Sequence, residues 1–294
     1  MLKSPAFRDG ILQWVSRNRS YFAFERGGSA LDNLKLLKPL GELAITADTL
    51  IRLDCDTTAC RDHLGWCWEQ LKHGEVLVDA LLIRPDLIVL STIYSSFHSH
   101  GFRSSKLDRL LAYLKASPSA LAVELPTWRR LDVCHGFERI GIGTLPDNPA
   151  AGTWLSALPE PWTITDDTAY ASTHNIFYIT DFGFMPERLT RDIRDYVGAW
   201  LGTWLEIYRR RTHWDLFAEF IMVAACLGIP CLPLVSELSE VQLVDGSMPG
   251  PEGAGKDFIA DGMDAERVAF LKNYHTTLVS LMACVMARSA RFRP

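Results

Sequence analysis

The strongest candidates for chemistry in this sequence lie within one segment, Thr165 to Gly183. With about 3.6 residues per helical turn, Tyr170, His174, Phe177 and Asp181 fall on one face. An imidazole on such a face can act as a general base or acid near neutral pH, and a carboxylate can orient a substrate or stabilise positive charge. Seven residues separate the histidine from the aspartate by about 10 Å along the helix axis. We therefore predict that the two groups flank one substrate without a hydrogen bond between them.

Two further observations support this segment as a helix that carries a site. Thr165 is a good N-cap, and Gly183 suits the position just past a helix end. A third predicted catalytic residue, His275, lies on the inward stripe of the last helix, which Asp264 caps. The competing interpretation is that each inward polar group is simply hydrogen-bonded inside the core.

The predicted substrate pocket is lined mainly by aromatic side chains. They come from the segment above, from a tryptophan-rich helix that we expect to begin at Pro186, and from the apolar run 216–235. The predicted lining residues are Tyr170, Phe177, Tyr178, Trp200, Trp204 and Glu219. Such walls suit a small, mostly apolar molecule or a short peptide.

Cysteine and histidine residues suggest an alternative metal site. Thiolates and imidazole are good zinc ligands, and Cys67, Cys134 and His135, with Cys60, offer such a set. The string Cys-His-Gly at 134–136 resembles the metal-binding Cys-His-Gly of lanthionine cyclases, which are α/α barrels. Because neighbouring residues on a helix point about 100° apart, Cys134 and His135 are poorly placed to share an ion. We favour structural cysteines, no metal and no cofactor.

The segment GPEGAGKD at 250–257 matches the spacing of a phosphate-binding loop. Asp257 stands where that loop needs a hydroxyl for magnesium, and no strand pattern precedes the segment. We therefore predict a surface loop.

The composition of the whole chain limits the classes of protein. Among 294 residues, 48% are hydrophobic and 22% are charged, which is typical of a soluble globular protein. A net charge of -5 argues against a nucleic-acid surface. The most apolar run carries Glu219 and is broken by Gly228 and Pro230, which argues against a membrane span. Seven cysteines and a start without an apolar signal segment favour the cytoplasm, and a homodimer is compatible with these features.

The hydrophobic periodicity predicts an all-α protein. About ten amphipathic segments follow one another like helical hairpins, and no sustained alternating pattern indicates a sheet. We expect an array closed into an α/α barrel (toroid) or left open as a solenoid, with a large helical bundle as the alternative. One domain is predicted over residues 1–294, with a candidate subdomain boundary in the loop 141–164, which is rich in glycine and proline.

Three segments together resemble a bacterial family of helical proteins without an established activity. They are THNIFYITDFG at 173–183, NYHTT at 273–277 and KPLGELAITADTL at 38–50. The resemblance implies an all-α bacterial protein, with a setting among natural-product genes. It implies no catalytic roles, but it places His174, Asp181 and His275 at matching positions.

The sequence thus favours a metal-independent tailoring enzyme that uses general acid-base catalysis. Cyclisation, isomerisation, hydrolysis and elimination are all open as its reaction. A helical binding or scaffold protein without chemistry and a zinc-type metalloenzyme are the two alternatives.

Overall fold

A computed structural model describes residues 4–23, 37–118 and 122–292, and within these ranges the chain is helical without any strand. The predicted all-α class is therefore confirmed, and a helical array fits the structure. Closure into a toroid stays a prediction. No helix in the described ranges combines the length and the apolar composition needed to cross a bilayer.

The chain divides into two units. One unit joins residues Met1–Phe22 to Trp154–Pro294, and the other is Ala23–Thr153. The junction between Thr153 and Trp154 lies within the segment 141–164, where the sequence suggests a subdomain boundary.

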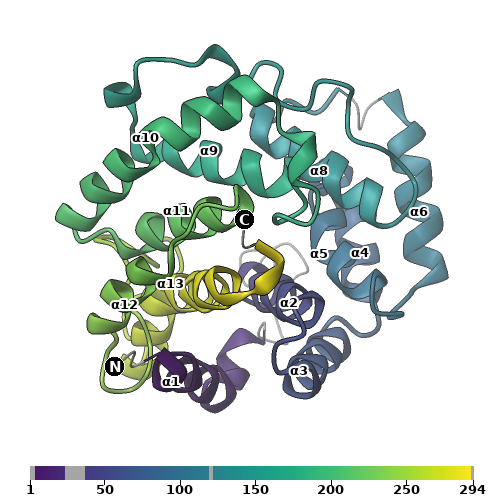
Figure 1. Ribbon diagram of the computed structural model, residues 1–294. Coiled ribbons are helices and arrows are strands. Elements are labelled where there is room, and N and C mark those ends of the chain that lie inside the picture. The colour runs from purple at the N-terminus through teal and green to yellow at the C-terminus, as the bar shows by residue number, and fades with distance from the viewer. Residues whose placement is uncertain (1–3, 24–36, 119–121, 293–294) are drawn as a thin grey trace. The chain divides into compact units, whose positions relative to one another are not determined.

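The described residues of the first unit form six α-helices that pack around an apolar core. In chain order they are α1 (Ser4–Arg17), α9 (Asp166–Ile179), α10 (Arg191–Arg210), α11 (Trp214–Cys226), α12 (Leu232–Glu240) and α13 (Ala265–Arg288). Short 3-10 helices lie at Arg19–Phe22, Leu155–Ala157, Pro161–Thr163, Pro186–Arg188 and Ala290–Phe292. Figure 1 shows α11 enclosed by α9, α10, α12 and α13, and each of these four helices contacts it.

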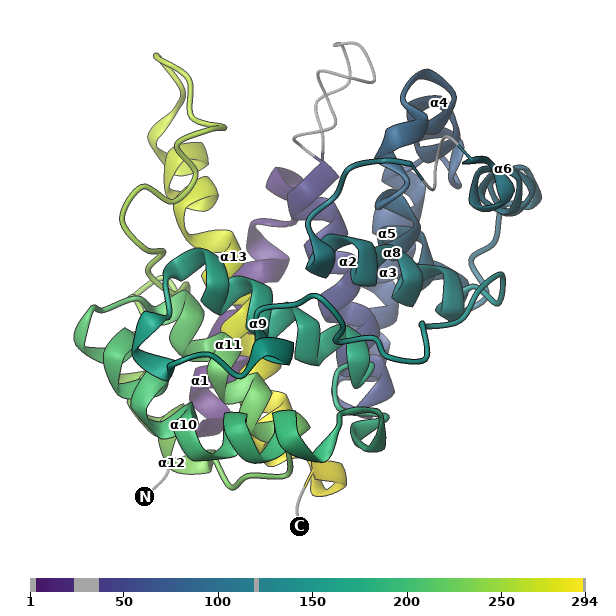
Figure 2. The ribbon, with the colours of Figure 1, turned by 90° about the horizontal axis from the view of Figure 1, so that it is seen from above.

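Helix α11 is the centre of this unit because it is buried on every side. Each of its residues from Asp215 to Cys226 is buried. A helix without a solvent-exposed face must be surrounded by other elements. Figure 2 shows α13 passing alongside both α11 and α1. Stacked and edge-on rings of Trp14, Phe22 and Phe270 fix α1 against α13.

The focal helix α9 begins as predicted and ends earlier than predicted. Thr165 accepts a hydrogen bond from the amide of Thr168, whose hydroxyl in turn accepts one from the amide of Thr165. The helix ends at Ile179, and Asp181 and Phe182 have φ values of 48° and 56°. Asp181 is therefore not on the helical face with His174, which corrects the predicted register.

The tryptophan-rich helix also begins later than predicted. Pro186 opens only a 3-10 turn, and Leu189 and Thr190 are extended before α10 starts at Arg191. On α10, Trp204 is fully buried, and its indole N–H donates to the carbonyl of Pro161 at 3.0 Å.

The second unit contains helices in paired contacts. They are α2 (Leu37–Arg52), α3 (Thr57–Gln70), α4 (Glu75–Ile83), α5 (Leu90–His98), α6 (Ser105–Ala116) and α8 (Thr127–Arg139), with a 3-10 turn at Pro85–Leu87. Helix α2 packs on α3 and α5, and α5 packs closely on α8.

We expect Gly136→Ala to lower the free energy of unfolding by about 1–3 kcal/mol, the usual cost of overpacking. A Cβ at Gly136 of α8 would lie 2.9 Å from both the Ser91 hydroxyl and the Thr92 amide nitrogen of α5. Because one of these neighbours is backbone, it cannot simply rotate away. Urea unfolding followed by circular dichroism would measure the loss. The control is Gly198→Ala on the exposed face of α10, where a Cβ meets nothing within 4 Å and stability should rise by about 0.5–1 kcal/mol. Equal stability of the two variants would contradict the prediction.

Candidate active site

Five ionisable side chains from three helices meet inside the first unit, and we call them the α11 centre. Tyr170 and His174 come from α9, Asp215 and Glu219 from α11, and His275 from α13. Ion pairs or hydrogen bonds connect each residue to at least one other member. The sequence places these helices far apart along the chain, and the fold brings them together.

Helix α11 presents its two carboxylates side by side. Asp215 and Glu219 are four residues apart, so they share one helical face. Both are only 2% exposed. The side chain of His213 caps the start of this helix by accepting a hydrogen bond from the Leu216 amide at 3.4 Å. Burial lowers the pKa of His213, and the charge of Asp215, which would raise this pKa, does not outweigh the effect of burial. This neutral cap holds the first turn that carries Asp215.

Helix α9 supplies a hydroxyl donor to each carboxylate. The Tyr170 hydroxyl donates to Asp215 Oδ2 at 2.5 Å. The Thr173 hydroxyl donates to Glu219 Oε2. Burial, followed by the charges of Asp215 and Glu219, raises the pKa of Tyr170 far above its ordinary value. Tyr170 therefore stays a neutral donor, and its proton is directed to Asp215.

The ring of His174 has a defined orientation. Its Nδ1 lies 2.8 Å from the carbonyl oxygen of Tyr170, which can only accept a hydrogen bond. Nδ1 therefore carries the proton, and Nε2 carries the lone pair when the ring is neutral. Glu219 Oε2 lies 3.6 Å from Nδ1, and the His174 side chain is 24% exposed. The imidazole thus has a carboxylate behind it and a path to solvent.

His275 faces both carboxylates. Its Nε2 lies 3.4 Å from Asp215 Oδ1 and 3.9 Å from Glu219 Oε1. The side chain is 28% exposed. The centre is therefore buried on its carboxylate side and accessible on its two histidine sides.

Some predicted pocket residues lie at this centre. The rings of Phe177 and Tyr178 have centroids 5.9 Å from that of His174, and the ring of Tyr170 lies 6.4 Å away. Glu219, predicted to bind substrate, is one of the two carboxylates of the centre.

Other predicted residues lie elsewhere. Trp204 contacts the rings of Trp154, Tyr196 and Phe220 in the core between α10 and α11. Trp200 is half-buried on α10. Asp181 follows the end of α9. Burial is the main cause that raises the pKa of Cys226 at the far end of α11, and the charge of Asp181 adds a small contribution.

Sequence reasoning missed Asp215 and Thr173. The available signal was the spacing of Asp215 and Glu219, which puts two carboxylates four residues apart in an otherwise apolar helix. An acid in the first turn of a helix also interacts favourably with the helix dipole. This ordinary role explains Asp215 without a functional site, so nothing in the sequence singled it out.

The residues that could hold a metal ion differ from the cysteine and histidine set that the sequence offers as an alternative. Within the described ranges, one group of three His, Cys, Asp or Glu residues has ligand atoms close enough to share a metal, all within 4.8 Å: Asp215, Glu219 and His275. Cys60, Cys67, Cys134 and His135 form no such group in those ranges. Cys60 and Cys67 are buried, and burial is the main cause that raises the pKa of Cys60 to about 12.

Two of the three glycines in the segment 250–257 are required by packing. A Cβ on Gly250 would lie 1.9 Å from the carbonyl oxygen of Lys272, and one on Gly255 would lie 2.8 Å from that of Leu271. Both glycines therefore allow this loop to lie against the start of α13, which explains them without a bound phosphate.

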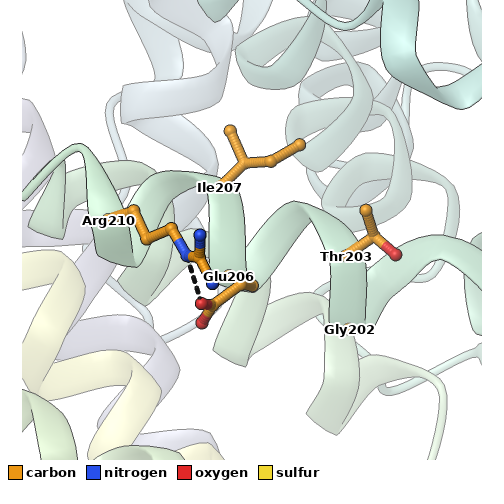
Figure 3. A pocket seen from close by; sticks show the side chains of 5 residues that line it. All are labelled: Gly202, Thr203, Glu206, Ile207 and Arg210. Carbon is orange, nitrogen blue, oxygen red and sulfur yellow. Dashed lines mark hydrogen bonds and ion pairs between the residues drawn. The ribbon is translucent and has the colours of Figure 1, made fainter.

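A surface depression on α10 offers little chemistry. Figure 3 shows its lining residues Gly202, Thr203, Glu206, Ile207 and Arg210 on one exposed face of the helix. Hydrogen bonds from Arg209 and Arg210 lower the pKa of Glu206 to about 2. The carboxylate is thus held by its own helix.

A comparison with known protein families identifies the family of this chain. The DUF6895 family, described as a domain of unknown function, matches residues 8–285. The chain belongs to this family. The resemblance to an uncharacterised helical family is thereby confirmed. No curated protein and no solved structure matches the chain. For this DUF6895 protein, function must therefore be argued from the α11 centre.

Proposed function

We propose that this protein is an enzyme that performs general acid-base chemistry at the α11 centre. The observation that carries the proposal is the pairing of two carboxylates, each 2% exposed, with two histidines that are about a quarter exposed. Buried carboxylates next to partly accessible imidazoles are more frequent at functional sites than in ordinary cores. A packing role alone would not need two acids on the most apolar helix of the unit.

His174 is the proposed general base or acid. Its Nδ1 proton is held by the Tyr170 carbonyl, so Nε2 takes and returns the substrate proton. Glu219, 3.6 Å from Nδ1, stabilises the imidazolium that forms. Tyr170 donates to Asp215 and so holds that carboxylate in place. The supporting role that sequence analysis gave to Asp181 is better assigned to Glu219.

The proposed substrate is a small, mostly apolar molecule or short peptide, of the kind that tailoring enzymes modify in bacterial natural-product pathways. Its support is the ring cluster of Tyr170, Phe177 and Tyr178 around the imidazole of His174. Proton transfer next to apolar walls suits cyclisation, isomerisation, hydrolysis or elimination.

We expect His174→Asn to abolish conversion of small molecules by the purified protein, because the asparagine amide cannot take up a proton as Nε2 does. The wild type and the variant would be incubated with a bacterial small-molecule extract, and the compounds consumed and formed would be followed by liquid chromatography and mass spectrometry. His73→Asn is the matched control, since His73 is exposed in the second unit and its φ of 54° is tolerated by asparagine.

The control variant should behave like the wild type. Conversion that continues unchanged in His174→Asn would overturn the proposal. Compounds that are retained by the wild type in equilibrium dialysis without being converted would instead identify a binding protein.

A further inference from the structure

In each carboxylate of the α11 centre, the two oxygens have different partners. Asp215 Oδ2 and Glu219 Oε2 accept hydrogen bonds from the hydroxyls of Tyr170 and Thr173. The second oxygen of each acid, Oδ1 and Oε1, points toward Nε2 of His275. Hydroxyls on α9 thus fix the acids in an orientation that directs one oxygen from each toward a common point.

One of these converging oxygens lacks a hydrogen bond. Asp215 Oδ1 is fully buried and accepts none from the described residues. Its distance of 3.4 Å to His275 Nε2 exceeds the usual range of about 2.7–3.2 Å for such a bond. Leaving a buried carboxylate oxygen in this state costs free energy. The arrangement is therefore better suited to a ligand than to an internal hydrogen bond.

The three converging atoms are spaced like the ligands of a metal ion. Bonds of about 2.0–2.2 Å in a tetrahedral site put neighbouring ligand atoms about 3.4 Å apart. The two observed separations from His275 Nε2 are 3.4 and 3.9 Å, and all three ligand atoms lie within 4.8 Å of one another. Side-chain rotation that brings each pair of ligand atoms to about 3.4 Å would complete the geometry.

We propose that Asp215 Oδ1, Glu219 Oε1 and His275 Nε2 bind a divalent transition-metal ion, Zn²⁺, Mn²⁺ or Fe²⁺. Two carboxylates balance the charge of such an ion, and the mixed oxygen and nitrogen set suits these three metals. Tyr170 and Thr173 act as the outer hydrogen-bond partners that orient ligands in metal sites. The partial exposure of His275 leaves room for water or substrate on the ion.

This inference replaces the metal-independent chemistry predicted from the sequence. It concerns the centre of the proposed function, but its test does not depend on turnover. A bound ion would polarise a substrate or activate water, and His174, which is not one of the three ligands, would still carry the proton.

The test measures metal binding directly. Untagged protein would be analysed for metal content by native mass spectrometry. Metal-free protein would then be titrated calorimetrically with each of Zn²⁺, Mn²⁺ and anaerobic Fe²⁺. We expect one ion per chain, with binding lost in Asp215→Asn, Glu219→Gln and His275→Asn. Tyr170→Phe should bind about 10–100-fold more weakly, the usual cost of losing an outer hydrogen bond.

Two controls and one measurement on the wild type complete the test. His73→Asn and Glu206→Gln change exposed residues outside the centre and should bind like the wild type. Pulsed electron paramagnetic resonance of the Mn²⁺-loaded wild type should show coupling to an imidazole nitrogen, so the proposal is testable even where a ligand variant does not fold.

Each outcome supports or overturns the site. Binding of none of the three ions, equal binding by wild type and ligand variants, or bound Mn²⁺ without nitrogen coupling would overturn it. His174→Asn should keep the metal and lose conversion. Loss of conversion in His174→Asn by a protein that binds no metal would leave the proposed function standing and reject the metal.

Discussion

Replacing Arg139 with methionine is expected to lower the free energy of unfolding by about 3–5 kcal/mol, because it leaves a buried carboxylate without its main counter-charge. Asp48 on α2 is 1% exposed. Arg139, at the end of α8, donates to both of its oxygens at 2.5 and 3.0 Å. His100 Nε2 lies 2.8 Å from Oδ1 of the same acid. These contacts join helices α2 and α8 to the turn that follows α5.

The pH dependence of the Arg139→Met effect follows from the pKa of Asp48. Burial alone would raise this pKa, but the hydrogen bond with His100 and the charge of Arg139 outweigh burial and lower it. A carboxyl whose pKa is lower in the folded protein than in the unfolded chain stabilises the fold at pH values above its unfolded pKa of about 3.9. This stabilisation is lost as the pH falls through the pKa of the folded state. Without the charge and hydrogen bonds of Arg139, less opposes the effect of burial, so the pKa of Asp48 is higher than in the wild type and the carboxyl takes up a proton at higher pH. The difference between variant and wild type should therefore be largest near neutral pH and shrink toward about pH 4.

Urea unfolding at several pH values would test both the size and the trend. Arg84→Met is the matched control, since Arg84 pairs with Asp86 on an exposed surface. The stability of this control should stay close to that of the wild type at every pH. A loss in Arg139→Met no larger than in Arg84→Met would show that Asp48 does not depend on its arginine.

The sequence was most informative about local structure. The Thr165 cap predicted the start of α9 because capping is a local interaction. The Thr165 hydroxyl accepts a hydrogen bond from the amide of Thr168, only three residues later. The end was wrong because the Thr180 hydroxyl accepts from the Gly183 amide, so the chain turns before the glycine. A glycine indicates that a helix ends nearby, but side-chain hydrogen bonds such as that of Thr180 determine at which residue it ends.

The sequence was less informative about which helices meet. Periodicity marked His174, Asp181 and His275 as inward polar groups, and the structure brings the two histidines to the carboxylates of the α11 centre but leaves Asp181 beyond the end of α9. The same periodicity could not separate Trp204, which packs in the core, from a pocket wall, since both positions are apolar. Asp215 was missed for a similar reason: only its tertiary neighbours distinguish it from an ordinary acid in a first helical turn.

The partners of a buried acid also determine whether it stabilises the fold. Asp48 has an arginine and a histidine within 3.0 Å. Asp215 and Glu219 have hydroxyl donors, and their ion pairs are with histidines at 3.4 to 3.9 Å. When those histidines are neutral, the two charges lie close together without a full counter-charge. Such an arrangement costs stability and is typical of sites built for function.

We therefore expect Asp215→Asn and Glu219→Gln each to raise the stability of the metal-free protein by on the order of 1 kcal/mol, because each removes a buried charge that lacks a full counter-charge. Urea unfolding at about pH 8 in the presence of a chelator would measure this, because an ordinary histidine is neutral there. Asp48→Asn is the matched control: it removes an equally buried charge that is well paired, so it should destabilise the protein. If all three substitutions destabilise the protein alike, the carboxylates of the α11 centre are structural, and the case for catalysis there loses its basis. Opposite signs would show that the fold tolerates Asp215 and Glu219 at a cost, as expected for acids retained for binding and proton transfer.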